Sequence, residues 1–152
     1  MDFKEQKRRF ELEKDQRIYD SALLTFTGVD GYDVYNCSIP FDWRGGRYIY
    51  GRVEKRDEWA RSRAMLFREA GPDVFALVEG SMIYQLEDPF VSVVGSELVL
   101  GGTHVRYECG KMTSYYDYFY KGTDLADMAY FTTGPDHMKD VRLIELPGGI
   151  GV

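Results

Sequence analysis

The sequence predicts a mostly β protein that begins with a single helix. Residues 3–17 are densely charged and contain no glycine or proline, whereas the chain from residue 21 onward consists of short apolar runs separated by glycine-containing turns. Aromatic residues make up 15% of the 152 residues, and aromatic side chains favour strands. Short strands with frequent turns are typical of sandwiches, barrels and propellers, and periodicity alone does not distinguish the three.

The N-terminal segment, residues 1–19, predicts an amphipathic helix that forms a unit of its own. Lys, Arg, Glu and Gln dominate it, while Phe3, Phe10 and Leu12 form a thin apolar stripe. We expect this helix to lie on the outside of the β body or against a partner chain. A frayed, charged leader is the alternative interpretation.

Residues 20–152 predict a series of short strands. Turn signals such as Asp30-Gly31 and Gly45-Gly46 interrupt the apolar runs. A charged segment before a hairpin occurs twice, at Glu87-Asp88 and Lys139-Asp140, and this spacing of about fifty residues is typical of propeller blades. The expected strands are residues 22–27, 47–53, 63–68, 74–79, 90–94, 97–100, 103–108, 115–120, 141–146 and 150–152.

Charge and composition exclude several classes of function. The net charge is −6 and the isoelectric point is near 5.0, so the chain lacks the basic face that nucleic-acid binding requires. The N-terminus is too charged for a signal peptide, and no apolar run is long enough to span a membrane. Cys37, Cys109 and two lone histidines match no metal spacing. We expect a cytoplasmic protein with free thiols, no metal, and no nucleic-acid or membrane partner.

Three polar clusters form the candidate site, because each stands next to an expected strand, where a rigid sheet presents side chains to open loops. Carboxylic acids beside arginines, an amide and a lysine suit polyhydroxylated or anionic ligands. The clusters are Asn36 with Arg52, Glu54 and Arg56; Glu87 with Asp88; and Lys139 with Asp140.

The alternation of Arg52, Glu54 and Arg56 places all three on one face of a regular strand. Glu54 would then orient both guanidinium groups and leave their outer N–H groups for sugar hydroxyls or phosphate. The alternative is a solvated ladder of charges that contributes little energy.

Glu87 and Asp88 are neighbours, so their side chains should point to opposite sides of an extended segment. Pro89 would keep Asp88 extended, and a carboxylic acid held in this way suits general-acid catalysis. A strand-entry turn in which Asp88 accepts backbone N–H groups is the alternative.

Aromatic residues crowd positions 115–120, where alternation divides them between two faces. One face could be a stacking platform for sugars, and a core between blades is the alternative. His137 could border the site through its loop, whereas His104 is expected to be structural.

The order and spacing of these motifs resemble the five-bladed β-propeller glycosidases and phosphorylases that act on β-mannosides. They resemble more closely a sister family of the same fold whose function is not established. The stretches that carry the resemblance are GYDVYN (31–36), GRVEKR (51–56), LEDPF (86–90) and GPDHMKDVRL (134–143).

The resemblance implies a partial five-bladed propeller of two to three blades that cleaves a glycosidic bond with inversion. Asp88 would be the general acid, and no second catalytic carboxylate is assigned. The substrate would be an oligosaccharide or small glycoside, attacked by water or by inorganic phosphate as co-substrate, with no other cofactor. The substrate-binding residues would be Asn36, Arg52, Glu54, Arg56, Glu87, Lys139 and Asp140.

Two departures from the family pattern stand out. Phe90 occupies the position where the phosphorylases usually carry an arginine, which weakens the case for phosphate as nucleophile. The chain is also about half as long as a five-bladed propeller, so we expect a truncated product or a chain completed by a partner. Open strand edges or the N-terminal helix would then favour a homo-oligomer, and turnover by this chain alone would be absent. A non-catalytic carbohydrate-binding or structural domain is the rival interpretation.

Overall fold

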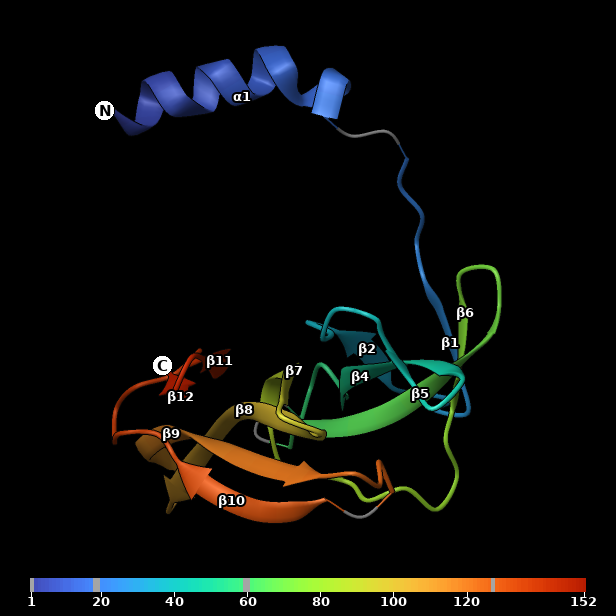
Figure 1. Ribbon diagram of the computed structural model, residues 1–152, viewed down its shortest axis with the longest axis vertical. Helices are drawn as coiled ribbons and strands as arrows, with labels where there is room; N and C mark the ends of the chain where they lie inside the picture. The colour runs from blue at the N-terminus through green and yellow to red at the C-terminus, as the bar shows by residue number, and fades with distance from the viewer. Residues whose placement is uncertain (1, 18–19, 59–60, 127) are drawn as a thin grey trace.

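The computed structural model describes residues 2–17, 20–58, 61–126 and 128–152, and Figure 1 shows a helix followed by three β-sheets. This confirms the predicted all-β class with one N-terminal helix. The elements are α1 (Phe3–Arg17), β1 (Thr25–Thr27), β2 (Asp33–Tyr35), β3 (Phe41–Trp43), β4 (Gly46–Glu54), β5 (Arg63–Gly71), β6 (Val74–Leu77), β7 (Glu87–Val94), β8 (Glu97–Glu108), β9 (Lys111–Gly122), β10 (Ala129–Thr133), β11 (Ile144–Leu146) and β12 (Gly149–Gly151).

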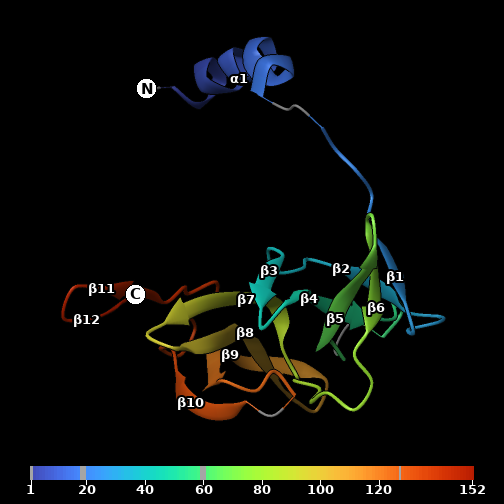
Figure 2. The same cartoon turned by 45° about the vertical axis from the view of Figure 1, so that its right-hand side comes forward.

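Helix α1 has the predicted bounds but does not pack on the β body, and its predicted alternative position against a partner chain stays a prediction. Phe3, Phe10 and Leu12 are 76%, 52% and 72% exposed, and Figures 1 and 2 show α1 apart from the sheets. Three scattered apolar residues do not make a continuous face that could pack on the β body. The predicted helical unit also includes residues 1, 18 and 19, which lie outside the described residues. No helix within the described ranges combines the length and apolarity needed to cross a membrane.

The first sheet contains six strands, and the second contains four. In the first, the order is β1-β6-β5-β4-β2, with β3 also paired to β4, and β1 runs parallel to β6 while the other neighbours are antiparallel. In the second, β7, β8, β9 and β10 follow one another as an antiparallel meander. Strands β11 and β12 form a separate hairpin. Each large sheet therefore resembles one blade.

The sheets pack face against face, as successive blades do. Tyr50 and Leu66 of the first sheet share one buried cluster with Leu98 and Leu100 of the second. The opposite face of the second sheet buries Phe119 in a cluster with residues 141 and 143, next to the β11–β12 hairpin. The fold is propeller-like, as predicted, and the count of five blades stays a prediction.

Strand β8 differs from the prediction, because one strand replaces the two expected at 97–100 and 103–108. Gly101 and Gly102 continue the strand where a side chain would not fit. A Cβ atom at Gly101 would lie 2.2 Å from the Phe90 ring, and one at Gly102 would lie 2.8 Å from the carbonyl oxygen of Glu87. These glycines mark close packing between strands instead of a turn.

Three strands, β2, β3 and β10, were not predicted, and three predicted strands, β1, β6 and β11, are shorter than expected. Residues 141–143 precede β11 instead of belonging to it, because the Val141 N–H donates to the buried Asp117 carboxylate at 2.5 Å. This bond attaches the segment to the second sheet through a side chain in place of a backbone ladder.

Candidate functional site

Three strands bring Asn36, Arg52 and Asp88 together at one edge of the β body. Asn36 follows β2, Arg52 lies in β4, and Asp88 lies at the start of β7. The Asn36 amide donates to Asp88 Oδ1 at 2.8 Å, and Arg52 Nη1 donates to the same oxygen at 3.0 Å. Two sheets thus meet at a single carboxylate.

Arg52 is the centre of this arrangement. Its Nη2 lies 3.2 Å from Glu54 Oε2 and 3.5 Å from Glu87 Oε1, and its Nε donates to Ser62 Oγ at 3.1 Å. The Arg52 side chain is 13% exposed, so its position is fixed by these partners. We call the group Asn36, Arg52, Glu54, Glu87 and Asp88 the carboxylate cluster.

Glu54 is the most deeply buried residue of the carboxylate cluster, with 4% of its surface exposed. The hydroxyl groups of Tyr35 and Ser62 both donate hydrogen bonds to its carboxylate. Tyr35 also lies opposite Arg52 in the β2–β4 register, and the Arg52 guanidinium stands 5.1 Å from its ring centre. Sequence reasoning missed Tyr35 and Ser62, although Tyr35 immediately precedes Asn36 in the motif.

Arg56 is held differently from the prediction. Strand β4 ends at Glu54, so the alternation does not extend to Arg56. Asp33 binds the Arg56 Nε at 2.8 Å, and the guanidinium lies 4.0 Å from the Tyr35 ring centre. Asp33 therefore orients Arg56, while Glu54 orients only Arg52.

The expectation that Glu87 and Asp88 point in opposite directions is wrong. A bulge interrupts the β7–β8 register between Glu87 and Phe90, and Asp88 has a φ of 49° instead of an extended conformation. A bulge re-aims side chains at a sheet edge. Both carboxylates consequently reach the guanidinium of Arg52.

Left-handed backbone conformations recur among the predicted site residues. Asn36, Asp88 and Asp140 have φ values of 45°, 49° and 61°. Asn and Asp tolerate this region better than other side chains, but it still carries strain. Strained residues concentrate at functional sites when the surrounding structure enforces them.

The two adjacent carboxylates differ electrostatically. Burial raises the pKa of Glu87 above its ordinary value, and the charges of Asp88 and Glu54 add to this effect. Arg52 and Lys139 act in the opposite direction, so Lys139 lies within electrostatic range of Glu87. Lys139 and Asp140 are exposed in the segment between β10 and β11.

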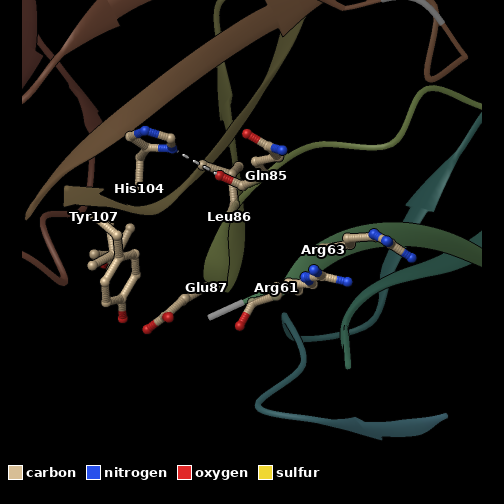
Figure 3. Close-up of a pocket in the computed structure, with 10 residues that line it drawn as sticks. Arg61, Arg63, Gln85, Leu86, Glu87, His104 and Tyr107 are labelled. Carbon is tan, nitrogen blue, oxygen red and sulfur yellow. Dashed lines mark hydrogen bonds between the residues drawn. The ribbon is translucent and has the colours of Figure 1, made fainter. Parts of the chain in front are cut away.

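A cavity of about 320 Å³ opens beside Glu87, between the two large sheets. Figure 3 shows the Glu87 carboxylate and the Tyr107 hydroxyl on the same side of this cavity, with Arg61 nearby. His104 forms part of the wall, where its Nδ1 lies 3.2 Å from the Gln85 carbonyl oxygen. Burial, followed by the Glu87 charge, raises the pKa of Tyr107. The sequence offered no motif for Tyr107.

Phe90, which directly follows Glu87, Asp88 and Pro89, belongs to the core and is 7% exposed. Its ring nonetheless lies next to a cation, because the Arg142 guanidinium stands 4.3 Å from the ring centre. His137, expected at the border of the site, pairs with Asp136 at 2.9 Å and packs edge-on against Tyr115. Across the described ranges, no three His, Cys, Asp or Glu side chains are grouped as a metal site would require.

Solved structures from Leishmania resemble this chain closely. MPT-4, a mannose phosphorylase from Leishmania mexicana in complex with phosphate ion, is 54% identical with a TM-score of 0.84, over 92% of this chain and 43% of that chain. MPT-1, a GDP-Man-dependent mannosyltransferase from the same organism, is 43% identical with a TM-score of 0.85, over 96% and 48%. A hypothetical protein from Leishmania major is 51% identical with a TM-score of 0.78, over 90% and 44%.

The chain thus spans less than half of the length of these solved proteins. A comparison with curated proteins found no match. A family model matches residues 10–152, nearly the entire chain. The chain therefore belongs to the family described as "Protein of unknown function (DUF1861)".

Proposed function

We propose that this chain supplies one side of the active site of a mannoside-active enzyme with a five-bladed propeller. The enzyme would break a glycosidic bond with inversion, using inorganic phosphate or water. The convergence of Asn36 and Arg52 on Asp88 carries the proposal. The 54% identity to a mannose phosphorylase supports mannosides as the substrate class. That match covers 43% of the phosphorylase, so the activity of the whole protein is part of the proposal.

Asp88 is the proposed general acid. Without ligand, Arg52 and Asn36 both donate hydrogen bonds to its carboxylate. A phosphate ion beside the cluster would compete for the Arg52 N–H groups and release the Asp88 side chain toward the leaving oxygen, to which a general acid donates its proton.

The proposed reaction balances with phosphate alone. A phosphate oxygen attacks the anomeric carbon, the bond from that carbon to the leaving oxygen breaks, and the Asp88 proton moves to the leaving oxygen. The proton carried by the hydrogen phosphate ion then passes to Asp88 and restores the acid. The products are a sugar with a free hydroxyl group and mannose 1-phosphate of inverted configuration. Attack by water would require a second carboxylate free to act as base, but Glu54 and Glu87 are both paired with Arg52. Arg52 and Lys139, which both act electrostatically on Glu87, offer cations for phosphate. We therefore favour phosphate.

A non-catalytic carbohydrate-binding domain is the second candidate. One observation favours it: Asp88 is already engaged by two donors, as expected of a residue that locks two blades together. In that case Arg52 and Asn36 would hold sugar hydroxyls without turnover.

The test uses the protein at full length with a β-linked mannobiose, with and without inorganic phosphate. We expect phosphate-dependent release of mannose 1-phosphate, and a loss of kcat/KM of about 10²–10⁴-fold in Asp88→Asn. Asp42→Asn makes the same chemical change on an exposed strand residue and should retain activity. Mannobiose binding with no product under either condition would support the binding domain and overturn the enzyme.

A further inference from the structure

A groove lined by tyrosines lies on the second sheet, outside the carboxylate cluster. Tyr116, Tyr118 and Tyr120 alternate along β9, so they share one face, and Tyr130 joins them from β10. The groove has a volume of about 780 Å³, and Arg106, Ser114 and Asp136 add polar groups. We call these four tyrosines the tyrosine groove.

The rings form a continuous row of edge-to-face contacts. Tyr118 lies 5.3 Å from Tyr116, 6.3 Å from Tyr120 and 5.9 Å from Tyr130 between ring centres, at interplanar angles of 77°, 76° and 90°. Tyr130 is 59% exposed. Edge-to-face packing holds aromatic rings in fixed orientations. The row is thus an ordered surface that is half-buried at Tyr116, Tyr118 and Tyr120 and open to solvent at Tyr130.

The two ends of the row differ. Tyr118 and Tyr120 both pack against the buried cluster between the large sheets, and the Tyr120 ring lies 4.6 Å from that of Tyr84. Tyr116 lies beyond that core, opposite His104 in the β8–β9 register. The inner end of the aromatic run is therefore interblade core, while the outer end is a free aromatic surface.

The groove presents neutral hydroxyl groups. The Tyr116 and Tyr118 hydroxyl oxygens lie 3.5 Å apart, and this contact, together with burial, raises the pKa of Tyr118 to about 12. Neutral rings and hydroxyl groups, bordered by the charged side chains of Arg106 and Asp136, fit a pyranose, which offers C–H bonds on its face and hydroxyl groups at its edge.

His104 connects the groove to the candidate active site. Its ring lies 4.8 Å from that of Tyr118, and it also lines the cavity that opens beside Glu87. Strand β7 begins at Glu87, opposite Thr103, so β8 and β9 extend past the start of β7. The end of the groove at Tyr116 therefore lies at the same end of the second sheet as Glu87 and the rest of the carboxylate cluster.

We propose that the tyrosine groove is an accessory binding site for a neutral mannooligosaccharide whose reacting end lies in the carboxylate cluster. This rests on the proposed function and deepens it, because it selects extended chains over disaccharides as ligands. The distal sugars stack on Tyr118 and Tyr130, and the chain passes His104 on its way to Glu87 and Asp88.

The test is titration calorimetry of the full-length protein with mannobiose and mannohexaose. We expect mannohexaose to bind about tenfold more tightly, since stacking on one or two rings contributes about 1.4 kcal/mol. Tyr118→Ala combined with Tyr130→Ala should abolish this advantage. Tyr118→Phe, which keeps the ring, and Tyr32→Ala, on the turn before β2, should retain it. If the double variant does not fold, Tyr130→Ala alone, which removes the most exposed ring, should reduce the tighter binding of mannohexaose.

Asp88→Asn separates this proposal from the proposed function. It should abolish turnover while preserving the tighter binding of mannohexaose. Wild-type protein that binds both ligands equally, or a folded double variant that retains the advantage, would overturn the accessory site. A chain-length advantage in a protein without turnover would support the groove and refute the enzyme.

Discussion

The carboxylate cluster and the tyrosine groove flank the same stretch of the second sheet, but they are held together by different forces. In the cluster, charge-assisted contacts of 2.8–3.5 Å fix each group to Arg52 or Asp88. In the groove, rings touch at centre-to-centre distances of 5.3–6.3 Å without any charge. The first arrangement defines the position of a few atoms, and the second provides area with little directional demand.

This difference matters for how each region responds to mutation. Removing one charge from a partly buried network leaves its partners desolvated and unpaired. Removing one ring from an open row loses only contact area, which water can replace. The cluster should therefore be sensitive to single substitutions, and the groove should be tolerant. Four measurements test this contrast, beginning with the largest expected effect.

Arg52→Ala should lower the free energy of unfolding by about 3 kcal/mol, because it leaves the buried Glu54 carboxylate and Asp88 without their cation. Urea denaturation monitored by tryptophan fluorescence measures the change. Arg56→Ala is the matched control, since its side chain is 66% exposed and the loss should be about 0–1 kcal/mol. Equal losses in the two variants would contradict the central role of Arg52.

Tyr130→Ala should lower the free energy of unfolding by about 1 kcal/mol or less, because the ring is mostly exposed and contributes mainly edge-to-face contacts. The same denaturation experiment measures this change, and Tyr130→Phe serves as the control that keeps the ring. A loss as large as that of Arg52→Ala would show that the groove is part of the core.

Glu87→Gln should produce a still smaller change that depends on pH. Burial raises the pKa of Glu87 in the folded protein above its ordinary 4.5, so the folded state binds this proton more tightly than the unfolded state. Wild-type stability therefore falls as the pH rises from 4.5 through the folded-state pKa. Glu87→Gln should be relatively more stable at pH 7 than at pH 4, as measured by urea midpoints. A difference that does not vary with pH would contradict the raised pKa.

Thiol labelling compares the segment next to the carboxylate cluster with an exposed hairpin, without altering the stability of either. Burial raises the pKa of Cys37, which follows Asn36, to about 11, whereas Cys109 is exposed at the tip of the β8–β9 hairpin. Iodoacetamide at pH 8 should alkylate Cys109 well before Cys37, because the thiolate is the reactive form. Peptide mass spectrometry follows both sites, and Cys109→Ser should leave slow labelling only. Rapid alkylation of Cys37 would contradict its burial.

The fold could largely be predicted, because glycine-rich turns and charged interruptions mark most strand boundaries. Strands β2, β3 and β10 escaped prediction because they are three to five residues long and owe their pairing to long neighbours. Gly101 and Gly102 caused the wrong prediction of two separate strands, since a glycine required by close packing looks the same in sequence as a glycine in a turn.

The residues of the candidate site could be predicted from the sequence better than their arrangement in space. Asn36, Arg52 and Asp88 could be grouped from their motifs, and the structure places them in contact. Tyr35 and Ser62 could not be found, because their importance arises from cross-strand register and from the burial of Glu54. The shared orientation of Glu87 and Asp88 depends on a bulge, which no local pattern announces.

The left-handed backbone at Asp88 also limits how this site could be redesigned. In a library of all substitutions at this position, the backbone conformation would decide which variants fold before their chemistry matters, because β-branched side chains clash at a φ near 49°. Variants with glycine or asparagine would fold, whereas variants with valine, isoleucine or threonine would fail to fold for reasons unrelated to catalysis. An inactive Asp88→Val variant would therefore carry no information about proton transfer. Any engineering of new acid chemistry here would have to move the carboxylate to a neighbouring position.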